Sequence, residues 1–215
     1  MVEDSVRCVE AGAAELHIHP RDGEGRESLA AVDALMEPLR RRCPGTLVGV
    51  STGAWIENDI DKTRTCIANW KALPDYALVN ISEPDAPAII ALLSQMGVGV
   101  EAGLASVDDA RRFTSLPQSR RVLRILIELE EQDTARADVV AAGIADVMDE
   151  AGIARPVLLH GFDATVWHFV RRARQRRWST RIGLEDGCHL PDGMLAGGNV
   201  DLVSAALRIF SSFAD

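Results

Sequence analysis

The sequence predicts one α/β domain, a TIM-type (β/α) barrel, on three observations. Seven short apolar runs rich in β-branched residues recur along the 215 residues, separated by segments with helical periodicity. Strands this apolar are typical of a parallel sheet covered by helices, either doubly wound or closed into a barrel. Nearly every run ends, on its C-terminal side, in polar residues able to do chemistry, which favours a barrel mouth over a single switch point.

The strands are expected where apolar and β-branched residues cluster between turn residues. In order along the chain, they are predicted at residues 15–19, 47–52, 76–82, 98–104, 122–129, 157–160 and 180–184. With 47% hydrophobic residues and no composition shift that marks a second domain, we expect a single domain over residues 1–215.

The helices are expected where apolar residues recur with the helical period. Residues 1–11 are predicted to form the first, because Ser5, Cys8 and Val9 are spaced like one helix face. The others are predicted, in order, at residues 28–42, 60–72, 86–96, 107–115, 137–151, 164–177 and 200–213.

Composition limits the classes of partner. A net charge of −9 and a pI near 5.1 oppose binding to nucleic acid, although residues 171–177 are locally basic. The chain has no window of about 20 apolar residues and no leader-like start, so we expect a cytoplasmic protein without a membrane partner. Its four cysteines are scattered, which is typical of reduced thiols rather than of disulfides or a structural zinc cluster.

The most informative motif is the His-x-His of His17 and His19. Side chains alternate between the two faces of a strand, so both imidazoles point the same way while Leu16 and Ile18 point the other way. A metal ion needs a further ligand from elsewhere in the chain, and the best candidate is Glu185, which follows the last apolar run. Two imidazoles and one carboxylate leave an open coordination position, as in catalytic metal sites. A histidine pair within a polar core layer is the alternative.

An ordered set of motifs resembles the β-keto acid cleavage enzymes, of which the 3-keto-5-aminohexanoate cleavage enzyme is the best described. The resemblance covers essentially the whole chain, through residues 11–22, 51–53, 79–82, 181–186, 190–193 and Asn199. It implies a (β/α)₈ barrel and a divalent metal, usually zinc, held by His17, His19 and Glu185. It also implies acetyl-CoA as co-substrate of a transferase that converts a β-keto acid into acetoacetate and a new acyl-CoA.

The resemblance assigns further roles by position. Arg181 and Asp186 match the pair associated with activating a water or abstracting a proton, although a buried ion pair is the alternative. Ser51, Thr52 and Gly53 match the turn that holds the substrate carboxylate, and Asn80 and Ser82 match the next strand end that lines the pocket. Glu101 matches a glutamate at a later strand end, grouped here with the substrate-binding residues. The resemblance also implies a homo-oligomer, a dimer or a tetramer.

One departure concerns the beginning of the barrel. Members of the family start with a strand that ends in a polar active-site segment, whereas residues 1–11 correspond to the helix that follows it. We therefore expect seven strands, with the first of the usual eight missing beside the metal ligands, and a metal site that is weaker or empty. A barrel without one strand leaves unpaired backbone groups at two edges unless another chain or loop covers them.

Two other functions compete with this interpretation. A shortened homologue that is impaired or no longer catalytic would keep the barrel as a binding or assembly partner. A metal-dependent amidohydrolase also begins from His-x-His on a barrel strand. It needs further ligands on the middle strands, however, and no middle strand offers a histidine before His160.

Overall fold

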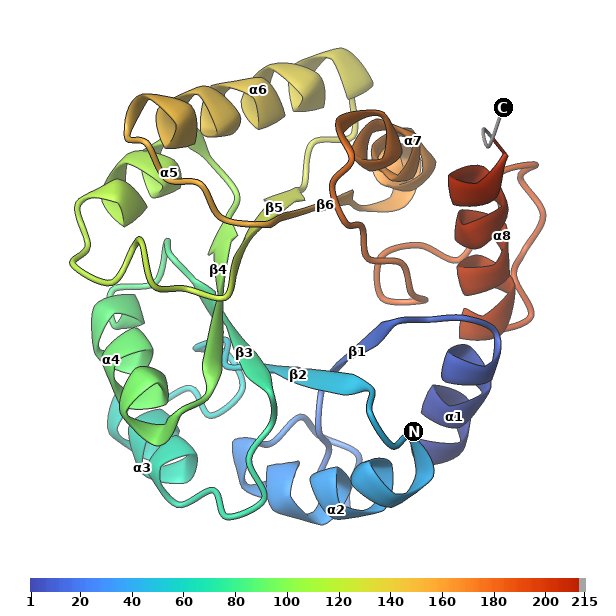
Figure 1. The fold of residues 1–215 in the computed structure, drawn as a ribbon. Helices are drawn as coiled ribbons and strands as arrows, with labels where there is room; N and C mark the ends of the chain where they lie inside the picture. The colour runs from blue at the N-terminus through green and yellow to red at the C-terminus, as the bar shows by residue number, and fades with distance from the viewer. Residues whose placement is uncertain (213–215) are drawn as a thin grey trace.

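The computed structural model of the chain describes residues 1–212, and six of its segments are strands of one parallel sheet. The sheet order is the chain order, and it curves into a half-barrel (Figure 1). The strands are β1 (Glu15–Ile18), β2 (Leu47–Ser51), β3 (Tyr76–Asn80), β4 (Gly99–Leu104), β5 (Arg124–Leu129) and β6 (Val157–Gly161).

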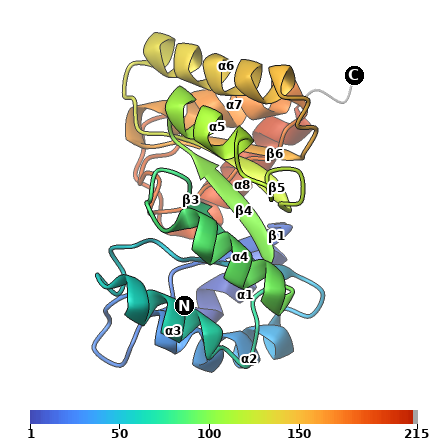
Figure 2. The ribbon, with the colours of Figure 1, turned by 90° about the vertical axis from the view of Figure 1, so that its left-hand side faces the viewer.

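The helices lie outside the curved sheet (Figure 1). They are α1 (Val2–Glu10), α2 (Val32–Arg42), α3 (Ile60–Ala68), α4 (Ala86–Met96), α5 (Val107–Thr114), α6 (Thr134–Glu150), α7 (Val166–Arg176) and α8 (Asn199–Ser211), with short 3₁₀ turns η1 (Leu29–Ala31) and η2 (Asp163–Thr165). Figure 2 shows α3, α4, α5 and α6 following one another along one side of the molecule. Several begin at a side-chain cap, since Asp59, Ser106 and Asp133 each accept a backbone N–H of the first turn.

The two faces of the sheet differ in chemistry because strand side chains alternate. Outward-pointing residues such as Val50, Val79 and Ile127 are buried with the helices in the main hydrophobic core. On the inner face, a small apolar cluster of Leu78, Leu126 and Leu158 is surrounded by charged and polar side chains. The apolar face therefore stabilises the fold, and the polar face is free to form a site.

Six of the predicted strands and all of the predicted helices are present, most of them with shifted ends. The prediction of a seventh strand at residues 180–184 is wrong. Ser179, just before this segment, forms an isolated bridge with Leu158 of β6, after which the chain turns at Gly183, whose carbonyl accepts the amides of Asp186 and Gly187. Too few residues remain extended to form a ladder. Phe213, in the expected last helix, lies outside the described residues.

Within residues 1–212 the sheet is open on one side, so the predicted closed barrel is not observed. The two edges are β1 and β6, with the segment after Ser179 alongside β6, and helices α1 and α8 pack against each other at this side (Figure 1). We call the space between β1 and residues 179–186 the seam. No helix within residues 1–212 is long and apolar enough to cross a bilayer.

A candidate metal centre beside the seam

Strand β1 places two imidazoles on the inner face of the sheet. Leu16 and Ile18 point outward into the main core, and this fixes His17 on the opposite face, with His19 directly after the strand. The ring centroids of His17 and His19 are 5.3 Å apart, and the His17 side chain is only 5% exposed. The sequence-based orientation of this pair matches the structure.

Glu185 reaches the histidines from across the seam. One ligand atom from each of His17, His19 and Glu185 can be chosen so that all lie within 4.8 Å of one another. His19 Nε2 is 3.4 Å from Glu185 Oε2. The turn that carries Glu185 is held by Asn199 at the start of α8, whose side-chain oxygen accepts the Leu184 amide at 2.8 Å and whose nitrogen donates to Asp4 of α1 at 2.7 Å.

The burial, unpaired nitrogens and lowered pKa of His17 suit a metal ligand. Both of its ring nitrogens are buried and have no hydrogen-bond partner within residues 1–212. Burial, together with the nearby charge of Arg181, holds the pKa of His17 well below its usual value. A neutral imidazole with unpaired nitrogens in a polar site is costly to bury, and it is also the form that binds a metal ion.

His19 and Glu185 stabilise each other's charged forms. Burial alone would lower the pKa of His19, but the carboxylates of Glu185 and Glu27 outweigh it and raise the pKa above its usual value. Burial alone would raise the pKa of Glu185, but His19 and Arg181 lower it to about 2. The carboxylate is therefore ionised at neutral pH, as a ligand must be.

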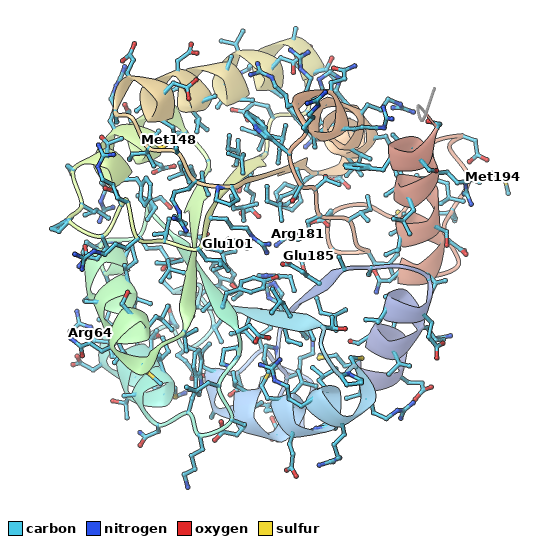
Figure 3. The ribbon with its side chains drawn as sticks, viewed as in Figure 1. Arg64, Glu101, Met148, Arg181, Glu185 and Met194 are labelled. Carbon is cyan, nitrogen blue, oxygen red and sulfur yellow. The ribbon has the colours of Figure 1, made fainter. Side chains whose placement is uncertain are left out.

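A closed ring of charged side chains adjoins the three donors. Arg181 Nη2 lies 2.9 Å from Glu185 Oε1, 3.1 Å from Asp186 Oδ1 and 3.3 Å from Glu128 Oε2. His160 completes the ring, with Nε2 2.8 Å from Glu128 Oε2 and Nδ1 3.4 Å from Asp186 Oδ1. Burial alone would lower the pKa of Arg181, yet the carboxylates around it, Asp186 first, raise it. Figure 3 shows Arg181 and Glu185 inside the ring of strands.

Glu101 lies on the inner face of the sheet as well (Figure 3). It is the third residue of β4, so its predicted position at a strand end is wrong. It is buried, forms an ion pair with Arg124 of β5 and has one oxygen 4.0 Å from His17 Nδ1. Arg124 also contacts Glu15 at 2.6 Å and lies over the Tyr76 ring. Tyr76 fits there because Gly49 on the neighbouring strand has no side chain, and a Cβ at Gly49 would overlap the ring.

The predicted substrate-binding residues of β2 and β3 lie at or just after the ends of these strands. Ser51 and Thr52 are buried, and the Thr52 hydroxyl donates to the Leu78 carbonyl at 2.7 Å. Ser51 Oγ accepts the Gly53 amide at 3.3 Å. Asn80 is half-buried and Ser82 is exposed. None of these five residues lines the cavity described next.

A cavity of about 590 Å³ occupies the seam. Helices α1 and α8 form its outer wall, and β1 with residues 179–186 forms its sides, so that His17, His19, Arg181, Glu185 and Asp186 all border it. Its size is within the range of small-molecule sites. The candidate metal centre therefore opens into a cavity that extends from the seam to the inner face of the sheet, where Tyr76, Glu101 and Arg124 line it.

Several contacts of the site were missed by sequence reasoning. The sequence assigns no role to Glu128, His160, Arg124 or Glu27. The available signal for Glu128 and His160 was the alternation of side chains along a strand, which places both on the inner face. There they are directly paired between β5 and β6. Glu27 lies in a loop, where no periodicity reports the direction of a side chain.

Comparison with protein-family models gives one match. The model described as beta-keto acid cleavage enzyme matches residues 1–214. No curated protein matches the chain.

Solved structures support the fold. ObcA, in a ternary complex with a C4-CoA adduct and oxalate, superposes with a TM-score of 0.77 at 16% identity, over 96% of this chain and 61% of the ObcA chain. The chain thus spans less than two thirds of ObcA. A 3-dehydroquinate dehydratase from Geobacillus kaustophilus gives a TM-score of 0.60 at 10% identity, over 100% of this chain and 87% of that one. A thiamine phosphate pyrophosphorylase from Pyrococcus furiosus gives 0.58 at 12% identity, over 100% and 91%.

Proposed function

The chain belongs to the beta-keto acid cleavage enzyme family, and we propose that it cleaves a β-keto acid at a divalent metal ion held by His17, His19 and Glu185. The observation that carries this proposal is the convergence of these three donors beside a cavity. Zinc is the proposed ion, because two imidazoles and one carboxylate are a common catalytic zinc set. When bound, the ion would act as a Lewis acid on a substrate carbonyl.

The proposed co-substrate is acetyl-CoA. One carbon–carbon bond forms between the acetyl carbonyl carbon and the α-carbon of the keto acid, and the bond from that α-carbon to its original keto carbon breaks. The acetyl thioester is broken and a thioester forms at the released acyl group, so the products are acetoacetate and a new acyl-CoA. The ligands named for the ObcA structures support this class of substrates, since they include a C4-CoA adduct and oxaloacetate, itself a β-keto acid.

Proton transfer is assigned to Asp186, with Arg181 as its partner. Asp186 is 2% exposed and is held by Arg181 at 3.1 Å and by His160 at 3.4 Å. A carboxylate in this position can take the α-proton of the keto acid, while the Arg181 guanidinium orients the carboxylate. His160 links Asp186 to Glu128, with its Nε2 2.8 Å from Glu128 Oε2.

The substrate carboxylate is assigned to residues at the C-terminal end of β2. Ser51, Thr52 and Gly53 offer hydroxyl and amide donors in one turn. Asn80, Ser82 and Glu101 complete the proposed substrate-binding set. Because the Thr52 hydroxyl and amide both donate to the Leu78 carbonyl and the Gly53 amide donates to Ser51 Oγ, the Ser51 hydroxyl is the freer donor of this turn.

The test is an assay of the purified chain with zinc, acetyl-CoA and a series of β-keto acids that includes oxaloacetate. We expect acetoacetate and a new acyl-CoA with at least one substrate, and loss of both products in His17→Ala and Glu185→Gln. Exposed Glu24→Gln is the matched control and should keep full activity. Zinc binding without turnover of any substrate would contradict the proposed reaction and favour a non-catalytic homologue.

A further inference from the structure

The loop between β1 and η1 brings a second carboxylate to His19. It folds back on itself through an antiparallel bridge between Arg21 and Glu27, and the Ser28 amide donates to the Pro20 carbonyl at 2.8 Å. Asp22 closes its tip by accepting the amides of Glu24 and Arg26. Glu27, eight residues after His19 in sequence, is thereby returned to the imidazole.

Glu27 faces the ring nitrogen that is directed away from Glu185. Its Oε2 atom is 3.2 Å from His19 Nδ1, whereas Glu185 approaches Nε2. The Glu27 side chain is 24% exposed. His19 Nδ1 has no aligned hydrogen-bond partner within the described part of the chain, so a small rotation of the ring is needed to make this contact a hydrogen bond.

Trp55 holds Glu27 in place. Its indole Nε1 donates to the same Glu27 Oε2 at 3.1 Å, and Arg21 lies 3.5 Å from Oε1. The Trp55 ring packs directly over Gly53, where any Cβ would overlap it. Gly53 thus makes room for the indole, the indole fixes the carboxylate, and the carboxylate faces the imidazole.

We propose that Glu27 is a positioning residue that holds His19 as its Nδ1–H tautomer and so presents Nε2 to the metal ion, with Trp55 fixing the Glu27 carboxylate. A carboxylate that accepts the free N–H of a metal-bound histidine orients the ring and raises the basicity of the ligating nitrogen. Glu27 is not itself a ligand, since it contacts the opposite side of the ring. The proposal rests on the proposed metal site, but it concerns residues that the reaction assigns no role.

The first test is zinc affinity, measured by competition with a chromophoric chelator. Glu27→Ala should weaken zinc binding by about 10- to 100-fold. Glu27→Gln keeps an acceptor oxygen and should recover part of the loss. Glu24→Gln in the same loop contacts no histidine and should leave affinity unchanged. Circular dichroism checks that each variant is folded, and an affinity for Glu27→Ala within twofold of wild type would overturn the proposal.

The second test reads the tautomer directly and needs no metal. In metal-free protein at about pH 9, where histidine is neutral, ¹⁵N NMR of the imidazole should show His19 as the Nδ1–H form in wild type and in Glu24→Gln. Glu27→Ala should shift it toward the Nε2–H form, and Trp55→Phe should do so partially. An unchanged tautomer in Glu27→Ala would refute the positioning role. If wild type bound no zinc, the proposed metal site would fail, and this measurement would still decide the role of Glu27.

Discussion

At the scale of single residues, the metal centre combines three groups in different protonation states. His17 is held neutral by burial, Glu185 is held ionised, and His19 has its pKa raised by two carboxylates. In the metal-free protein, the ion pairs of His19 contribute stability that is fully present below its unfolded pKa. That contribution is lost as pH rises through its higher folded value.

A pH dependence of zinc binding follows from these states. Zinc must displace the proton of His19, so its affinity should fall by up to about tenfold per pH unit as pH drops below the pKa of His19. We expect zinc binding to release only one proton, because His17 is already neutral and Glu185 is already ionised. Calorimetric titrations between about pH 5.5 and 7 in two buffers of different ionisation enthalpy measure the protons released. Release of two protons, or a constant affinity over this range, would contradict the assignment.

Residue-level prediction from sequence is confirmed for the orientation of the histidine pair, since His17 and His19 had to share a face once residues 15–19 were extended. Glu185 did not depend on strand parity, because the apolar run before it forms a turn and not a strand. The ring of Glu128, His160, Arg181 and Asp186 could not be derived in the same way. It depends on the register between β5 and β6 and on a turn after Ser179, which are tertiary features.

At the scale of elements, close packing on the inner face constrains β2 and β3. Gly49 of β2 lies under the Tyr76 ring of β3, which is also covered by the Arg124 guanidinium at 4.5 Å. Tyr76 in turn donates its hydroxyl to the Leu16 carbonyl of β1 at 3.2 Å. This contact joins the strand that carries the histidines to the middle of the sheet.

Gly49→Ala should therefore destabilise the protein. The added methyl group would displace the Tyr76 ring, and overpacking of this kind costs about 1–3 kcal/mol. Urea unfolding followed by fluorescence or circular dichroism measures the loss. Gly23→Ala is the control, because a Cβ at Gly23 meets open space, and its free energy of unfolding should change by less than about 1 kcal/mol. Equal stability of Gly49→Ala and wild type would contradict the packing described.

Elements were more predictable than their ends. The α4 segment contains a long apolar run, and α4 occupies the predicted residues 86–96. The segment at 180–184 misled because Ile182 and Leu184 give it an apolar alternation, while Gly183 and the charged residues around it favour a turn. Local pattern reports strand propensity, but a strand also needs a partner edge, and here the facing edge of β1 lies across the seam.

At the scale of the whole molecule, the half-barrel has a well-paired middle and two exposed edges. Strands β2 to β5 have neighbours on both sides, whereas β1 and β6 each have one full-length neighbour. Backbone amides of doubly paired strands open least often. We expect β3 and β4 to be the most stable part of the sheet and the seam the least stable.

Hydrogen exchange measured by mass spectrometry tests this gradient. Amides of β3 and β4 should exchange most slowly, and those of β1 and residues 179–187 much faster. Saturating zinc should slow exchange on both sides of the seam together, since ligand binding at about 100 times its Kd stabilises the bound state by about 2.7 kcal/mol. Glu185→Gln should abolish this effect. Protection confined to one side would contradict a metal ion bridging them.

The position of the ligands across the seam has a mechanical consequence. His17 and His19 lie on one side of the seam and Glu185 lies on the other. A cation bound by all three would therefore link the two edges of the open sheet. Any movement of β1 relative to residues 179–186 changes the distances between the three donor atoms. The curvature of the sheet and its affinity for the ion are then thermodynamically linked. A distant substitution that flattens the sheet should weaken ion binding without contacting the ion.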